Sequence, residues 1–217
     1  MTRIITLSIA ILLSITAAQA QHAAGTHDES AARDRNVAAF TIGDTEVGVY
    51  AGVATKYTTM FGEHAGLLEL RGAFTVDRRW SIGLVGAGLW YDKSLHELVD
   101  DGSYRIEMAY GGIFVERMFS LSDHFILSLS VASGQGEVRY IYDKEYRDEK
   151  TWTEETIDRT TFAFFEPSVG MQFQVSDRVW LGLSGSYRNT SPVQLIGTDE
   201  NVFRTFSGGL TLTYGVF

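Results

Sequence analysis

The sequence predicts an all-β protein, an eight-stranded antiparallel up-and-down β-barrel whose strands cross a membrane. Three observations support this prediction: an apolar export signal at the N-terminus, a short turn motif that recurs along the chain, and an amphipathic strand that runs to the last residue, Phe217. A final strand of this kind can pair with the first strand and close the sheet, so that no strand edge is left open.

Residues 1–20 fit a cleaved secretory signal peptide. Arg3 supplies the basic start, an apolar run covers residues 4–15, and Ala18-Gln19-Ala20 fits the small-residue cleavage rule. The apolar run is shorter than the about 20 residues that a membrane-spanning helix needs. We therefore expect cleavage near Ala20 and export from the cytoplasm.

The composition excludes several classes of protein. The chain has no cysteine, which excludes a lipid-anchored lipoprotein and any disulfide framework. Without Arg3, 17 Lys and Arg remain against 27 Asp and Glu, a net charge of −10. That balance argues against binding to nucleic acid, which depends on cations that neutralise phosphates. The mean hydropathy of −0.02 is compatible with a barrel, because barrel strands need only about 9–11 residues of alternating character.

The chain changes character near Glu46. Residues 21–45 are rich in small and charged side chains and follow neither the helical nor the strand period, which predicts a flexible leader. From Glu46 onward apolar and polar residues alternate with period two, the pattern of β-strands. The barrel domain is therefore predicted to cover residues 46–217.

A short motif recurs at residues 74–80, 119–125 and 173–180. Each copy runs from an aromatic through a polar and an aliphatic residue to an aspartate near a basic residue, and then becomes apolar again, as a tight turn between two strands does. Three short turns at one end and four longer loops at the other predict eight strands. The predicted strands are 46–58, 65–76, 80–91, 104–118, 124–142, 157–175, 179–189 and 202–217. The most charged outer loop, within 143–156, is predicted to be a solvated hairpin tip.

Alternation within the strands assigns their two faces. Strand 65–76 places Leu68 and Leu70 on one face and charged residues on the other, and strand 179–189 repeats this division. In strand 104–118, we expect Ile106 and Met108 to face lipid. So small a barrel has room inside for side chains alone, and ionised side chains there need partners. The predicted packed polar lumen contains Lys56, Glu69, Arg71, Arg105, Glu107, Glu166 and Arg188.

Aromatic residues cluster near the predicted strand ends, where membrane proteins carry belts at the two interfaces. The predicted belts contain Trp80, Trp90, Tyr91, Phe125, Trp180 and Tyr187.

Together, these features resemble the small outer-membrane β-barrel superfamily of the outer membrane protein X and outer membrane protein A transmembrane-domain type. The resemblance covers residues 46–217, and its most specific part is the C-terminal signal read by the barrel-assembly machinery. The matching positions are Ser207, Gly209, Leu212 and Tyr214, followed by the terminal Phe217, which is out of phase with Tyr214. The resemblance implies a monomer in the Gram-negative outer membrane, in contact with membrane lipid and lipopolysaccharide, with the assembly machinery as partner during biogenesis.

The function predicted on this basis is structural or surface-interacting, without catalysis and without a cofactor. One alternative is a lipid A-modifying enzyme, for which Glu63, His64, Ser94 and His96 are available, although they do not reproduce the deacylase motif. Another alternative is a secreted soluble ligand-binding barrel with an apolar lumen. His22 and His27 in the leader lack the preorganisation that a metal site requires, so no metal is predicted.

Overall fold

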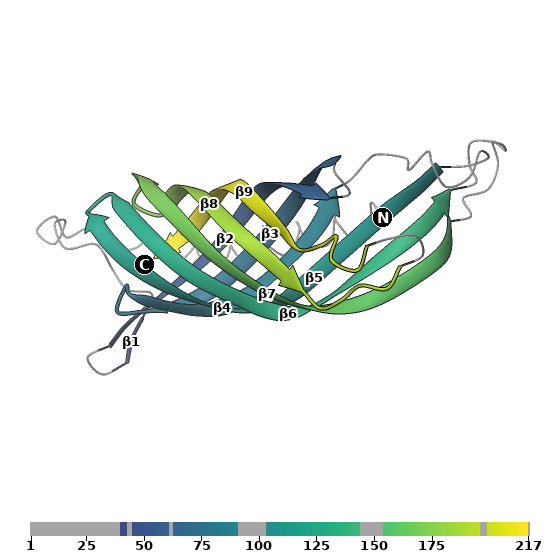
Figure 1. Ribbon diagram of the computed structural model, residues 1–217. Coiled ribbons are helices and arrows are strands. Elements are labelled where there is room, and N and C mark those ends of the chain that lie inside the picture. The colour runs from purple at the N-terminus through teal and green to yellow at the C-terminus, as the bar shows by residue number, and fades with distance from the viewer. Residues whose placement is uncertain are drawn as a thin grey trace, which may run out of the picture. The chain divides into compact units, whose positions relative to one another are not determined.

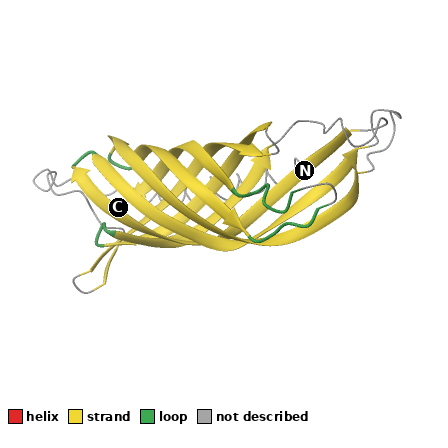
Figure 2. Cartoon of the chain, viewed as in Figure 1, coloured by secondary structure: helices red, strands yellow, loops and turns green. Residues whose placement is uncertain are grey.

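The computed structural model describes residues 40–42, 45–60, 63–90, 103–143, 154–195 and 199–216. These residues form strands joined by turns and short connections (Figure 2). No helix of membrane-spanning length and hydropathy lies within these ranges. The strands are β1 (Phe40–Ile42), β2 (Thr45–Met60), β3 (Glu63–Val76), β4 (Trp80–Trp90), β5 (Ser103–Ser122), β6 (Phe125–Asp143), β7 (Glu154–Ser176), β8 (Val179–Thr190) and β9 (Thr205–Val216).

Strands β2 to β9 close into a ring. Each strand pairs antiparallel with the next along the chain, and β9 pairs with β2 from Val216 opposite Val49 to Ser207 opposite Thr58. Figure 1 shows these strands crossing obliquely around one barrel. The predicted eight-stranded antiparallel up-and-down barrel is therefore confirmed.

The three copies of the recurrent motif form the tight turns at one end of the barrel. They lie at Asp77–Arg79, Asp123–His124 and Asp177–Arg178. The first turn is held by β2, because the Asp77 amide donates to the Glu46 carbonyl over 2.9 Å and the Glu46 amide donates to the Asp77 side chain over 3.3 Å.

One short strand falls inside the predicted leader. β1 pairs with the start of β2, with Phe40 opposite Val47 and Ile42 opposite Thr45. This pairing places a strand before Glu46, where the sequence analysis predicted a flexible leader. The β-branched and aromatic residues Phe40, Thr41 and Ile42 favour a strand there. The rest of the leader and the predicted signal peptide lie outside the described residues.

Strands β5, β6 and β7 are longer than their neighbours. They contain 20, 19 and 23 residues, against 11 in β4 and 12 in β8. In the described chain, β4 pairs with β5 only as far as Ala109, and β8 pairs with β7 only as far as Phe164. Residues 103–108, 138–143 and 154–162 consequently form a three-stranded sheet beyond the ring, here called the β5–β7 extension (Figure 1).

Candidate functional site in the lumen

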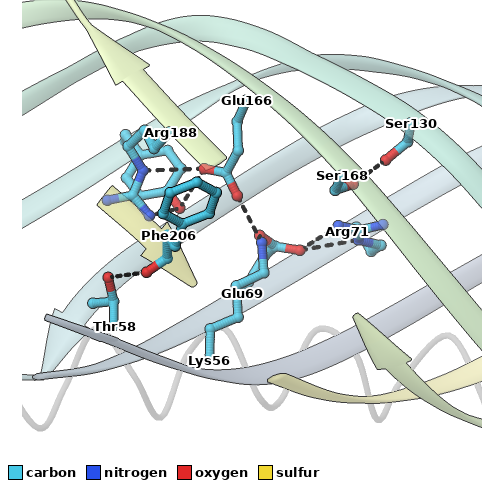
Figure 3. A network of polar contacts seen from close by, with 10 residues as sticks. Lys56, Thr58, Glu69, Arg71, Ser130, Glu166, Ser168, Arg188 and Phe206 are labelled. Atoms are coloured by element: carbon cyan, nitrogen blue, oxygen red, sulfur yellow. Dashed lines mark hydrogen bonds and ion pairs between the residues drawn. The ribbon is translucent and has the colours of Figure 1, made fainter. Parts of the chain in front are cut away.

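Five of the residues predicted for the lumen meet at one level of the barrel, contributed by four strands. Lys56 of β2 places its Nζ 2.5 Å from Glu69 Oε2 and 2.9 Å from Glu166 Oε1. Arg71 Nη2 lies 2.5 Å from Glu69 Oε1. Figure 3 shows Lys56 between the two carboxylates, with Arg71 beyond Glu69 and Arg188 beyond Glu166. Here these five residues are called the ionic layer.

Arg188 of β8 completes the layer beside Glu166 of the adjoining strand β7. Its side chain is fully buried, its Nε lies 3.0 Å from Glu166 Oε2, and its Nη2 donates to the Tyr110 hydroxyl over 2.8 Å. The guanidinium carbon also lies 4.3 Å from the centre of the Tyr110 ring. Since a buried charge is costly unless it is paired and hydrogen-bonded, the shared contacts explain how this barrel holds several ionised groups inside.

A sixth charge, on Glu116, lies nearer the turns. Glu116 accepts a hydrogen bond from the Tyr50 hydroxyl over 2.6 Å. It balances the third cation, so that three carboxylates face three cations among the described side chains of this polar middle. Beside Glu116 and Arg71, the small and polar side chains of β6 to β9 leave a cavity of about 20 Å³, enough for about one water molecule.

Apolar side chains close the lumen on both sides of this polar middle. Near the turns, Met118, Ile126 and Trp180 form a buried cluster. At the opposite end a larger cluster fills the space between the strands and inside the β5–β7 extension. It consists of Met60, Leu67, Ala87, Ile106, Met108, Tyr110, Val138, Tyr140, Phe162, Phe164, Val193, Leu195 and Phe203. Among the described residues, the lumen therefore has apolar clusters at both ends. The charged middle also contains a small apolar cluster of Tyr50, Ala73, Val85 and Phe114.

Three members of the larger cluster come from the connection between β8 and β9. Val193 and Phe203 are fully buried and Leu195 is nearly so. The Phe203 ring stacks on Phe162, with centroids 6.1 Å apart and planes 2° apart. This connection, of which residues 191–195 and 199–204 are described, places apolar side chains in the end of the lumen. Sequence alone did not predict this path.

The predicted faces of strand 104–118 are wrong. Ile106 and Met108 are buried inside, whereas Ile113 is exposed on the outer wall. Glu107 accordingly lies on the outer wall, where its Oε2 is 3.3 Å from Arg139 Nη2, and it does not join the ionic layer. The reason is that this part of β5 belongs to the β5–β7 extension, whose inner face is an apolar core. The side chain of Arg105 lies outside the described part of the chain.

On β3 and β8 the predicted faces are confirmed. Leu68, Leu70 and Leu183 are exposed on the outer wall, and Glu69 and Ser186 are buried inside. Glu166 also faces inward, because β7 stays in register with β6 through Pro167.

The predicted aromatic belts are placed in part. Trp80, Phe125 and Tyr187 are exposed on the outer wall. Trp180 was predicted wrongly: alternation along β8 turns it into the lumen, where it is buried. Tyr91 and the side chain of Trp90 lie outside the described residues.

The predicted belts leave out further aromatic residues that lie on the outer wall. Strand alternation could have identified them, because each lies two residues from another outward side chain. Near the turns these are Phe119, Phe173 and Tyr214, and at the other end Tyr57, Phe165 and Phe206. Some pair across strands, as Phe125 does with Phe173 and Tyr187 does with Phe206, with centroids 5.1 Å and 4.7 Å apart.

The residues of the predicted assembly signal lie on the closing strand, β9. Leu212 and Tyr214 point outward, Ser207 is buried inside, and Gly209 is opposite Lys56. A Cβ on Gly209 would lie 2.5 Å from the Thr55 carbonyl oxygen, so this position requires a residue without a side chain. Phe217 lies outside the described residues.

The groups considered for catalysis do not form a described site. The Nδ1 atom of His64 is hydrogen-bonded to the Tyr57 hydroxyl on the exposed wall. Ser94 and His96, the side chain of Glu63, and the leader histidines His22 and His27 lie outside the described residues. Within the described ranges, no cluster of three or more metal-ligating side chains is present.

Neither a protein-family model nor a curated protein sequence matches the chain. Solved structures do match it. Neisserial surface protein A is 13% identical over 78% of this chain and 96% of its own, with a TM-score of 0.49. The attachment invasion locus protein Ail of Yersinia pestis is 13% identical over 78% and 97%, with a TM-score of 0.43. A de novo designed transmembrane β-barrel is 9% identical over 78% and 95%, with a TM-score of 0.41. Similarity at these identities concerns the fold alone.

Proposed function

We propose that this chain is an integral β-barrel of the bacterial outer membrane, with a structural or surface-interacting role and without catalytic activity. The observation that carries the proposal is the inverted polarity of the barrel: ion pairs are buried inside, and large apolar side chains cover the outside. Exposed apolar residues occur on all eight strands of the ring; examples are Val53, Leu70, Leu84, Val115, Leu129, Met171, Leu183 and Leu212.

The height of this apolar surface fits a bilayer. On β9, the outward aromatic residues Phe206 and Tyr214 mark the two ends of the apolar surface. These positions are about 27 Å apart along the strand, which corresponds to about 20 Å along the membrane normal at the usual strand tilt, close to the apolar band of outer-membrane barrels. In water, an apolar surface of this extent would be a strong aggregation site, which counts against the soluble carrier.

The filled lumen supports a non-conducting role. The ionic layer lies between two apolar clusters of described residues, and the cavity beside Glu116 and Arg71 has room for about one water molecule. A structural or surface role needs no passage through the barrel, whereas a porin needs a water-filled one.

The β5–β7 extension supports contact with the exterior. Its strands continue past the apolar surface, and its outer wall is charged: Glu107, Glu137, Arg139 and Arg159 lie there. In this arrangement the turns face the periplasm, and lipopolysaccharide surrounds the base of the extension. The signal peptide of residues 1–20, the assembly machinery as partner and a monomeric state belong to the same proposal.

Heat-dependent gel mobility tests the proposal. Outer membranes from cells that express the full chain are separated with and without boiling in detergent. We expect the protein in the outer-membrane fraction, migrating faster when unboiled, because closed barrels resist detergent. Recovery in the soluble periplasmic fraction would contradict membrane insertion. Mass analysis of lipid A with and without expression tests the enzymatic alternative, and we expect identical spectra.

A further inference from the structure

An arginine interrupts the apolar outer wall of the barrel close to the turns. Arg117 lies on β5 opposite Trp80 of β4 and Leu129 of β6. Its outward neighbours two residues away are Val115 and Phe119, both exposed. The guanidinium group is therefore surrounded by side chains that face hydrocarbon in the proposed function, on which this inference rests.

The described residues give Arg117 aromatic neighbours and no carboxylate partner. Its guanidinium carbon lies 4.8 Å from the Trp80 ring centre and 5.5 Å from the Phe119 ring centre. These rings are 51% and 41% exposed, so they reach the surface together with the arginine. Contact with aromatic faces stabilises a cation but leaves the guanidinium hydrogen-bond donors unsatisfied, and an arginine needs acceptors for them.

The depth of Arg117 places these donors at the height of lipid headgroups. Trp80 directly follows the turn Asp77–Arg79, and the Met118 amide donates to the Arg79 carbonyl over 2.8 Å. Cationic side chains on a lipid-facing wall cost about 2–4 kcal/mol at the bilayer midplane and almost nothing near the interface. At the interface, the acceptors that match a guanidinium are phosphate oxygens, which arginine binds in bidentate fashion.

A second cation lies beside this position. Arg79 is exposed and, like Arg117, forms no ion pair with the described residues. The carboxylates nearest along the turn are already bound, since Asp77 accepts the Glu46 amide and Glu46 pairs with Arg78 at 3.3 Å. Arg79 therefore adds a second exposed cation at the turn next to Arg117.

We propose that Arg117 and Arg79 bind the phosphate of an anionic phospholipid in the inner leaflet, with Trp80 and Phe119 against its glycerol and upper acyl chains. The class of ligand is a phosphatidylglycerol-type lipid. Two cations without an ion pair among the described side chains favour a headgroup with net negative charge over a zwitterionic one, whose ammonium group would need a free carboxylate.

Native mass spectrometry of the refolded mature chain in detergent tests this site. The probes are phosphatidylglycerol and phosphatidylcholine with identical acyl chains, added at equal concentrations. We expect more phosphatidylglycerol than phosphatidylcholine on the wild type and about fivefold less on Arg117→Gln, a loss typical of one exposed charge interaction. Arg79→Gln should lower it less, and Arg117→Lys should retain part of the binding because the charge remains.

The matched control is Arg178→Gln. Arg178 lies in the corresponding turn between β7 and β8 and is exposed, but the tryptophan that follows it, Trp180, points into the lumen. We expect its phosphatidylglycerol binding to equal that of the wild type. Equal binding of the two lipids, or an equal loss in Arg178→Gln and Arg117→Gln, would overturn the proposed site.

Gel mobility of the same samples separates the two levels of the proposal. A wild type that forms no heat-modifiable barrel would overturn the membrane function together with the lipid site. If the wild type and all variants form heat-modifiable barrels but bind the two lipids equally, the lipid site alone is overturned. If Arg117→Gln fails to fold, the comparison of the two lipids on the wild type and on Arg117→Lys still decides.

Discussion

Glu166 joins the two cationic sides of the ionic layer, because each of its carboxylate oxygens meets a different cation. Oε1 faces Lys56 Nζ, and Oε2 accepts from Arg188 Nε at 3.0 Å and from the Tyr110 hydroxyl at 3.3 Å. Removal of its charge would leave two buried cations sharing the remaining carboxylates. One glutamate from β7 therefore links β2, β5 and β8.

Glu166→Gln is the direct test of this link. The amide keeps the shape but not the charge, so we expect the free energy of unfolding to fall by about 3–5 kcal/mol, as when one partner of a buried pair is removed. Urea unfolding in phospholipid vesicles, followed by tryptophan fluorescence, measures the change.

Glu107→Gln is the matched control, because Glu107 also pairs with an arginine but on the partly exposed outer wall. We expect it to cost less than about 1 kcal/mol. Similar losses in both variants would show that burial of the ionic layer adds nothing to its stability.

The turn between β3 and β4 has two residues in the left-handed region. Asp77 has φ of 50° and Arg78 has φ of 53°. Such a turn fits the twist of a two-stranded hairpin, and its second position favours glycine. Aspartate tolerates this backbone better than arginine does, because its side chain is short and polar. Here that side chain accepts a hydrogen bond from the Glu46 amide of β2.

Arg78→Gly should therefore stabilise the barrel by about 0.5–1 kcal/mol, because the relief of the left-handed backbone exceeds the added chain entropy of glycine. The lost Arg78–Glu46 pair is exposed and adds little. Urea unfolding measures the gain. Arg178→Gly is the control, because neither Asp177 nor Arg178 has a positive φ. We expect this variant to be less stable than the wild type, and a gain in its stability would contradict the backbone explanation.

At the scale of elements, β5 shows why alternation alone could not assign every face. Its two faces both carry large apolar residues: Ile106, Met108 and Phe114 inside, Ile113 and Val115 outside. From the sequence, Arg105 and Glu107 were assigned to the inner face of this strand. In the ring Glu116 does point inward, but Arg117 lies on the outer wall beside Trp80 and Phe119. In the β5–β7 extension an apolar core lies inside, and Glu107 is on the outer wall.

The β8–β9 connection is the element that completes the outer apolar layer, and Phe203 is its centre. Phe203→Ala should lower the free energy of unfolding by about 3–5 kcal/mol, because a buried ring leaves a cavity. Phe206→Ala is the matched control: this ring is 74% exposed on the adjoining strand, so its loss should cost about 1 kcal/mol or less. Urea unfolding in vesicles compares them, and equal losses would mean that Phe203 is not packed inside.

The sequence could not predict the path of this connection, because its three buried apolar residues are too few and too far apart along the chain to define an element. Val193 follows a proline, Leu195 lies two residues on, and Phe203 lies across a turn. Their burial depends on the apolar inner face of strands that are distant in sequence, such as Phe162 of β7. The paired strands and the three aspartate turns were predictable because each depends on neighbours along the chain.

At the scale of the whole molecule, the ring exists only if β9 pairs with β2. Their ladder runs over ten positions, from Val49 opposite Val216 to Thr58 opposite Ser207. Inside, the same closure brings Lys56 of β2 to the carboxylates of the ionic layer. The sequence predicted this closing strand because its alternation continues unbroken, although residues 202–204 of the predicted strand belong to the β8–β9 connection. The depth of each residue in the proposed membrane depends on the lengths of all the strands together.

The closing strand also sets the test for the molecule as a whole, with Leu212→Asp and Tyr214→Asp combined. Both side chains point outward at the turn end of β9, opposite Val53 and Ala51 of β2. Two carboxylates there would cost several kcal/mol of insertion near the apolar surface and would disrupt the residues expected to be read during assembly. We expect the variant to be absent from the outer membrane and degraded in the periplasm, as fractionation and unboiled gels would show.

The same pair of aspartates placed outside the membrane is the control. Thr156→Asp with Arg159→Asp changes two exposed positions of the β5–β7 extension, where water surrounds the outer wall in the proposed orientation. We expect normal assembly and normal heat-dependent mobility. Normal assembly of the β9 variant would contradict the proposal. It would mean that the outer wall near Leu212 and Tyr214 faces water, because only a surface in water tolerates two added carboxylates.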